Sequence, residues 1–209
     1  MEVVDSNSIV TDNENEKKRN PEAALEELLA GNRRFTSGRT SSHRRDLAIL
    51  QQMMERQEPF AAILSCADSR VPVEVVFDQT IGQLFVTRVA GNIVTPEIVA
   101  SLEYAAAVLG TNTILVMGHS RCGAVTAAIQ GQEVPGNISA LFPYIEPAVE
   151  QAGPDLEATI RANVLIQAAR LRQYSSLLAS LIDDGKLKVA AGYFDILSGE
   201  VTLLDEPGL

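Results

Sequence analysis

The sequence predicts an α/β fold in which a mostly parallel central β-sheet is flanked by helices and preceded by an N-terminal helical arm. From residue 60 onward, short apolar runs typical of buried strands alternate with longer segments whose apolar residues recur at helical spacing. The run at 113–118 is almost continuously apolar, which is typical of a strand covered on both faces of a parallel sheet. The 209 residues suffice for one domain with its own core, and they contain neither an internal repeat nor an interdomain linker.

The first part of the chain divides into a tail and an arm. Residues 1–20 are polar and charged without periodicity, so we expect a mobile tail there. Residues 21–209 are then one domain, of which 21–58 form the helical arm. An arm of this length either covers the domain or reaches across to a partner subunit.

Two helices are expected in the arm. The first begins at Pro21 with Asn20 as its N-cap, since Asn is a favoured cap and Pro is favoured at the first helical position. Gly31–Asn32 is expected to weaken or end it. A polar, basic loop follows, and the second helix is expected over 46–56.

Strands and helices are expected to alternate after the arm, because the apolar pattern changes period repeatedly. The expected strands are 60–64, 84–89, 113–118, 188–193 and 199–204, and the expected helices are 96–109, 122–129 and 155–184. The turn at 195–199 predicts that the last two strands form a hairpin.

Composition excludes several function classes. The formal net charge is −10, which argues against nucleic acid as a partner because a phosphate backbone requires a basic patch. There is no apolar run long enough to cross a membrane and no apolar segment typical of a secretory signal, so we expect a cytoplasmic protein. The two cysteines do not indicate a disulfide framework.

Cysteine and histidine follow two of the predicted strands, at the point where each strand ends. Cys66 follows the strand at 60–64, and His119 and Cys122 follow the strand at 113–118. If these strands are neighbours in a parallel sheet, the three side chains converge at one sheet edge. Zinc binds thiolates and imidazoles, and a Cys₂His set with an open fourth position is typical of catalytic zinc sites. Two buried thiols, or a Cys66–Cys122 disulfide, are the alternatives.

A carboxylate and a guanidinium stand beside the first cysteine. Asp68 and Arg70 alternate in the loop and therefore point the same way, which favours a bidentate ion pair. Such a pair can orient a metal-bound water while keeping the carboxylate ionised, although a plain structural salt bridge would use the same residues. Gly123 opens a helix at the same edge, where its N–H suits an anion such as bicarbonate; close packing is the alternative.

These motifs resemble those of the β-class carbonic anhydrases, and the resemblance extends from about residue 21 to about residue 204. It rests on Cys66-Ala67-Asp68-Ser69-Arg70-Val71, His119-Ser120-Arg121-Cys122-Gly123 and the closing segment 191–199. The resemblance implies a zinc enzyme in which zinc-bound hydroxide attacks CO₂, interconverting CO₂ and bicarbonate. It also implies a homodimer or larger homo-oligomer with the active site at the subunit interface.

The resemblance assigns roles to five residues. Cys66, His119 and Cys122 match the zinc ligands, with one Zn²⁺ per chain, and Asp68 and Arg70 match the catalytic dyad. In some family members this aspartate occupies the fourth zinc position in a closed, inactive state, whereas others keep water there.

Three further residues match the open, plant-like members. Gln57, Phe85 and Tyr104 match the CO₂ pocket, which the family places across the interface from the partner subunit. The Gln amide can hydrogen-bond a bicarbonate oxygen, and the two rings supply an apolar wall. Phe85 and Tyr104 could instead be ordinary core residues; the match of all three favours the open type.

The chain also departs from the family pattern. It has no Trp, which puts the family's regulatory bicarbonate site in doubt, although Arg88 matches a family arginine. The loop at 77–83 is one residue longer than in plant-type members, so the pocket entrance is expected to differ. His43 is expected to be an exposed loop residue, with a proton shuttle at the pocket mouth as the alternative.

Two other functions stay open. One is a zinc lyase or hydrolase acting on carbonyl sulfide or carbon disulfide, a choice that depends on the shape of the pocket. The other is a catalytically silent relative that binds bicarbonate or scaffolds an assembly. The complete ligand set and dyad argue against a silent protein.

Overall fold

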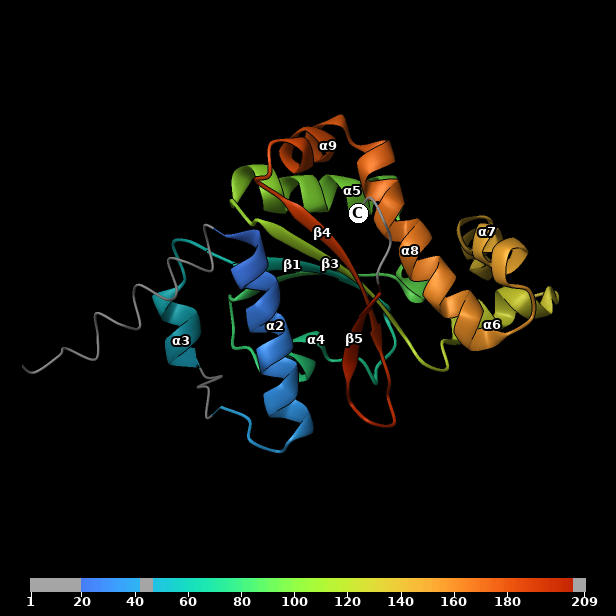
Figure 1. Ribbon diagram of the computed structural model, residues 1–209, viewed down its shortest axis with the longest axis horizontal. Coiled ribbons are helices and arrows are strands. Elements are labelled where there is room, and N and C mark those ends of the chain that lie inside the picture. The colour runs from blue at the N-terminus through green and yellow to red at the C-terminus, as the bar shows by residue number, and fades with distance from the viewer. Residues whose placement is uncertain (1–19, 42–46, 205–209) are drawn as a thin grey trace, which may run out of the picture.

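The computed structural model of the chain describes residues 20–41 and 47–204. Within this part of the chain five strands form one sheet in the order β2-β1-β3-β4-β5 (Figure 1). The strands are β1 (Ala61–Ser65), β2 (Leu84–Arg88), β3 (Thr113–His119), β4 (Lys188–Phe194) and β5 (Val201–Leu204). The pairs among β1 to β4 are parallel, and β5 is antiparallel to β4. The predicted mostly parallel α/β fold and its closing hairpin are therefore confirmed.

Helices cover both faces of the sheet (Figure 1). One face packs against α5 (Pro96–Glu103), η2 (Tyr104–Val108), α8 (Leu156–Tyr174) and α9 (Ser176–Asp183). The other packs against α2 (Pro21–Thr36) and α4 (Val73–Val76). No helix in the described ranges is long and apolar enough to cross a membrane.

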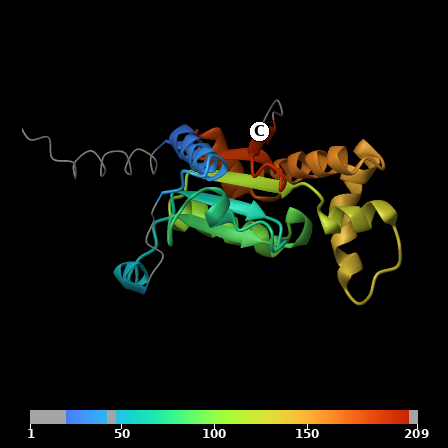
Figure 2. The same ribbon diagram turned by 90° about the horizontal axis from the view of Figure 1, so that it is seen from below.

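The remaining helices lie at the two ends of the strands. Beyond the carboxyl ends lie η1 (Ala90–Asn92), α6 (Gly123–Gln130), η3 (Ile138–Leu141) and α7 (Phe142–Ala152). At the opposite end of the molecule, α3 (Leu47–Gln52) stands apart from the sheet (Figures 1 and 2).

The first helix begins as predicted and ends later than predicted. The side chain of Asn20 accepts a hydrogen bond from the backbone of Glu22 at 2.9 Å, so the predicted N-cap is confirmed. The helix does not end at Gly31–Asn32, because these residues dock it onto the domain. A side chain at position 31 would lie 1.8 Å from the carbonyl oxygen of Phe77, so only glycine permits this approach. The buried amide of Asn32 bonds backbone groups of α4 and of the final hairpin.

Two other helix predictions need correction, and two helices were not predicted at all. The helix expected over 155–184 is two helices, because Ser175 has extended backbone angles and caps α9 through a bond from Leu178. The helix expected over 46–56 spans only Leu47–Gln52, and position 46 lies outside the described residues. The sequence reasoning did not predict α4 or α7.

A buried carboxylate also ties α2 to the domain. Asp78 is 1% exposed and has a φ of 48°, and it accepts hydrogen bonds from Arg34 Nε at 2.6 Å and from the backbone of Ser41. Burial raises the pKa of Asp78, but the hydrogen bonds from Arg34 and Ser41 outweigh it, so the pKa lies below the ordinary value. This carboxylate therefore stabilises the fold in its ionised form.

Asp78→Asn is expected to lower the free energy of unfolding by about 2 kcal/mol at neutral pH, because a buried charge-assisted hydrogen bond is lost. Asn tolerates the positive φ, so backbone strain contributes little. Since the pKa of Asp78 is lower in the folded state, its contribution is present above about pH 4 and is lost at lower pH. Urea unfolding at several pH values should show the two proteins converging in acid; a constant difference would contradict this assignment.

Candidate metal centre

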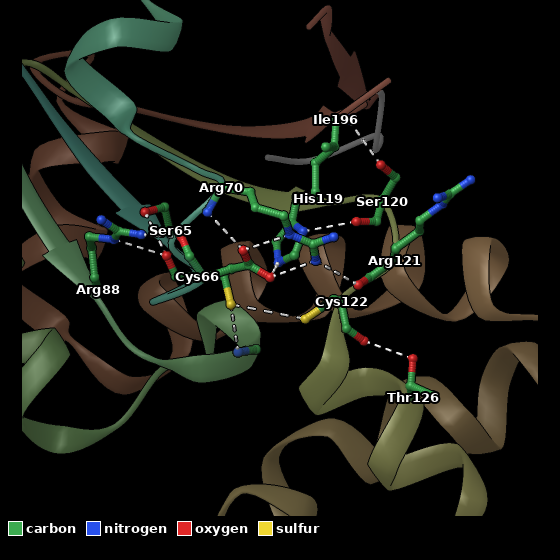
Figure 3. Close-up of polar contacts among 12 residues, drawn as sticks. Ser65, Cys66, Arg70, Arg88, His119, Ser120, Arg121, Cys122, Thr126 and Ile196 are labelled. Atoms are coloured by element: carbon green, nitrogen blue, oxygen red, sulfur yellow. Dashed lines mark hydrogen bonds and ion pairs between the residues drawn. The ribbon is translucent and has the colours of Figure 1, made fainter. Parts of the chain in front are cut away.

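Two thiols and one imidazole meet at the carboxyl ends of β1 and β3 (Figure 3). The two strands are parallel neighbours, with Ser65 opposite Met117, so Cys66 and His119 emerge at the same edge. Cys122 is the residue before α6. The ligand atoms of Cys66, His119 and Cys122 all lie within 4.8 Å of one another, and all three residues are buried.

The turn between His119 and Cys122 aims both side chains at the same point. Arg121 has a φ of 57°, so the chain reverses within two residues after the strand. His119 Nδ1 lies 2.9 Å from the carbonyl oxygen of Ser120, to which an Nδ1–H can donate. The lone pair is then left on Nε2, which is buried and has no hydrogen-bond partner among the described residues. A buried, unpartnered imidazole nitrogen facing two sulfurs fits a zinc ion.

The two thiols form a hydrogen-bonded pair. Their Sγ atoms are 4.0 Å apart and both cysteines are free, so the structure does not show the disulfide alternative. The hydrogen bond with Cys122 holds the pKa of the Cys66 thiol below its ordinary value against the opposing effect of burial, and the N–H of Gly91 acts in the same direction. The same hydrogen bond and burial raise the pKa of Cys122. The pair therefore stabilises one thiolate, the form in which cysteine binds a metal.

Asp68 and Arg70 form a bidentate ion pair beside this cluster. Asp68 Oδ1 accepts from Arg70 Nε at 3.0 Å and from its backbone at 2.9 Å, and Oδ2 accepts from Nη2 at 2.8 Å. Arg70 thereby holds the pKa of Asp68 well below its usual range. Asp68 Oδ2 lies 3.9 Å from His119 Nε2, so an ionised carboxylate faces the cluster.

Arg88 holds the loop that carries this carboxylate, a role that the sequence reasoning missed. Its Nε donates to the carbonyl of Cys66 at 3.0 Å and its Nη2 donates to that of Asp68 at 2.6 Å. Arg88 is the last residue of β2 and lies directly opposite Ser65, the residue before Cys66. Aligning the ends of the two predicted strands could therefore have placed Arg88 beside the Cys66 loop.

Gln57 and the two aromatic residues gather at a second place. The rings of Phe85 and Tyr104 are 6.3 Å apart between centroids and tilted by 42°. Gln57 and Tyr104 line one surface cavity of about 530 Å³. Tyr104 opens the π-helical segment η2 and is 46% exposed, so it is not an ordinary core residue in this chain.

This second cluster lies away from the thiols of the same chain. Phe85 is the register partner of Ala62, which precedes Cys66 by four residues. Four residues span about 13 Å along an extended strand. One chain therefore does not bring Phe85 to its own Cys66.

Two remaining predicted residues have different outcomes. Gly123 is the first residue of α6, and a side chain there would meet no described atom within 4 Å, so close packing does not explain the glycine. His43 lies outside the described residues, and its predicted exposure stays a prediction.

The sequence model of the carbonic anhydrase family matches residues 61–201, which include all three converging side chains. This chain belongs to the carbonic anhydrase family. Carbonic anhydrase 2 of Mycobacterium tuberculosis is 32% identical over 207 residues, covering 90% of this chain and 95% of that protein. Carbonic anhydrase of Pseudomonas aeruginosa is 36% identical over 176 residues, covering 75% of this chain and 78% of that protein.

Similarity to solved structures shows that this chain belongs to the β class of carbonic anhydrases. The β-carbonic anhydrase CcaA has a TM-score of 0.69 at 28% identity, with 88% of each chain covered. One of the two tetrameric β-carbonic anhydrases from Sordaria macrospora has a TM-score of 0.67 at 25% identity, covering 75% of this chain and 86% of that one. The predicted family resemblance is confirmed: the chain is an enzyme of the β-carbonic anhydrases, which hydrate CO₂.

Proposed function

We propose that this carbonic anhydrase hydrates CO₂ reversibly at a zinc ion held by Cys66, His119 and Cys122. The observation that carries the proposal is the buried Nε2 of His119, which has no hydrogen-bond partner in the described chain and lies within 4.8 Å of both sulfurs. Leaving such an atom without a partner costs free energy that a metal ligand bond offsets. Zinc, when bound, acts as a Lewis acid that makes hydroxide available near neutral pH.

The residues of this chain then orient the reactants. Asp68 stays ionised beside Arg70, and its Oδ2 accepts a hydrogen bond from the attacking water, which fixes the direction of attack. The backbone N–H of Gly123, at the N-terminus of α6, stabilises the negative charge of the bicarbonate product.

We assign the chain to the open type of site. Arg70 holds both carboxylate oxygens of Asp68, and Arg88 holds the carbonyl of the same residue. These bonds favour an Asp68 carboxylate that remains paired with Arg70 instead of binding the metal as a ligand. Activity near neutral pH is the expected consequence.

We also propose that the partner subunit completes the site in a homodimer or larger homo-oligomer. Gln57, Phe85 and Tyr104 gather on one face but lie away from the thiols of their own chain. A partner could bring its three residues to this centre, where the rings form the apolar wall for CO₂ and the amide bonds bicarbonate.

Mixing two inactive variants tests the shared site. Each proposed site combines a metal half, made by the zinc ligands with Asp68 and Arg70 of one chain, and a pocket half, made by Gln57, Phe85 and Tyr104 of its partner. Asp68→Asn disables the metal half. The double variant Gln57→Ala/Tyr104→Ala disables the pocket half. Co-expressed, they are expected to recover roughly a quarter of wild-type activity, because random mixed dimers contain one intact site. As the control, Asp68→Asn is co-expressed with Arg70→Ala, which alters the same half and should recover nothing. Absence of recovery in the first mixture, with mixed dimers present, would show that each chain builds its pocket alone.

The choice of substrate is tested on one zinc-loaded preparation. Stopped-flow hydration of CO₂ is compared with hydrolysis of carbonyl sulfide and of carbon disulfide. We expect CO₂ to react fastest, since the family hydrates CO₂. Faster turnover of either sulfur compound would overturn the assignment, and zinc without any turnover would favour a silent bicarbonate-binding protein.

A further inference from the structure

Two buried amide side chains on α8 bond the turn that contacts Cys66, and they take no part in the chemistry proposed above. Asn163 is 1% exposed and Gln167 is 0% exposed. They are one helical turn apart, and Gln167 Nε2 donates to Asn163 Oδ1 at 3.0 Å. Burying two amides is costly unless their hydrogen bonds are made, so their partners indicate what they hold.

Both amides hold the turn that follows β2. Asn163 Nδ2 donates to the carbonyl of Gly91 at 2.9 Å, and Gln167 Oε1 accepts from the N–H of Val94 at 2.9 Å. Gln167 Nε2 also donates to the carbonyl of Tyr144 at 2.8 Å, which anchors the pair to α7. The turn is thus bonded at both of its ends to α8.

The other side of this turn touches the first thiol. The N–H of Gly91 points at Cys66 Sγ at 3.4 Å, while the carbonyl of the same residue accepts from Asn163 (Figure 3 shows the contact with sulfur). Gly91 therefore links an amide of α8 to a sulfur of the metal centre.

The turn has a conformation that its surroundings must enforce. Gly91 has a φ of 77° and Asn92 a φ of 43°, both in the left-handed region. Glycine adopts this region readily, whereas a non-glycine residue such as Asn92 persists there where neighbouring groups hold it. The positive φ favours glycine at position 91, and a side chain there would also come within 2.9 Å of the end of the Ile145 side chain, which would have to shift.

We propose that Asn163 and Gln167 are positioning residues for the thiolate of Cys66. They fix the 91–94 turn so that the N–H of Gly91 donates to this sulfur and would orient it as a metal ligand. The proposal rests on the proposed zinc centre. Hydrogen bonds to a ligand atom orient it and tune its donor strength, and their loss typically weakens metal affinity by about 10- to 100-fold.

The test uses the full chain with Asn163→Leu, which keeps the branching and the number of heavy atoms of the side chain but removes its hydrogen-bonding groups. Zinc affinity is measured by competition with a chelator, and the cobalt-substituted protein reports on the sulfur through its charge-transfer band. We expect zinc affinity to fall by about 10- to 100-fold. The charge-transfer band should move to longer wavelength, because a thiolate without this hydrogen bond gives up an electron to cobalt at lower photon energy.

Asn32→Leu is the matched control. Asn32 is also a buried helical amide that bonds two carbonyls and one N–H, but it joins α2 to the far side of the domain. It should lower stability without changing zinc affinity or the cobalt spectrum. Equal changes in both variants would show that general loosening, not positioning, is responsible.

Two further measurements keep the proposal decidable. If Asn163→Leu does not fold, Gln167→Met takes its place: it removes the second amide and should give the same changes in zinc affinity and in the cobalt spectrum. The unaltered chain loaded with cadmium-113 should show scalar coupling between the metal and the amide proton of Gly91 through Cys66. Bound metal with no such coupling, or variants that match wild type, would overturn the positioning role alone. A wild-type chain that takes up no metal would overturn the zinc centre instead.

Discussion

Cys122→Ser is expected to abolish zinc binding and CO₂ hydration together. A serine hydroxyl stays protonated near neutral pH, whereas zinc requires an ionised sulfur at this position. Zinc should fall from about one per chain to near zero after dialysis, and turnover should fall on the order of 10³-fold or more. Metal analysis and stopped-flow hydration on the same samples measure both.

The fold should survive this change, which makes the result interpretable. Cys122 occupies the N-cap of α6 with extended backbone angles, and its side chain makes no capping bond. Serine is a preferred residue at such a position, so the helix loses nothing. The circular dichroism spectrum should therefore match wild type. Retention of full zinc and full turnover by Cys122→Ser would remove Cys122 from the ligand set.

Asp68→Asn is expected to keep zinc and to slow CO₂ hydration by about 10²- to 10⁴-fold, the range typical of lost general acid–base or orienting groups. Asn cannot carry the negative charge that Arg70 stabilises, and its amide nitrogen would face the guanidinium. The three proposed zinc ligands are untouched, so metal content should stay near wild type. Stopped-flow rates corrected for metal content measure the effect.

Asp78→Asn is the matched control for this variant. Asp78 is also an aspartate bonded to an arginine, at 2.6 Å from Arg34, but it serves the docking of α2. It should lose stability and keep the turnover of the folded enzyme. A rate for Asp68→Asn equal to that of Asp78→Asn would exclude Asp68 from the mechanism.

The sequence was sufficient to predict the fold and the convergence of two cysteines and one histidine, because both depend on local patterns. Apolar runs gave the strands, and the residues just after two of them gave Cys66, His119 and Cys122. One assumption joined the two motifs, namely that the strands are parallel neighbours, and the pairing of β1 with β3 confirms it.

Features that depend on distant contacts could not be predicted. Gly31 weakens a helix by intrinsic propensity, but its lack of a side chain lets α2 approach Phe77. Asn163 and Gln167 read as polar positions on a helix, and only the folded chain shows that they are buried against the 91–94 turn. The cap at Ser175 was visible in principle, but apolar residues on both sides masked the break.

Zinc content and CO₂ hydration, measured together across pH on one purified sample, test the central claim most directly. Our account predicts about one zinc per chain and fast turnover already near pH 7, because Asp68 stays ionised on Arg70 and would not itself act as a ligand to the metal. Zinc with turnover only at alkaline pH would contradict the open site. Protein purified under reducing conditions without zinc would contradict the metal centre itself.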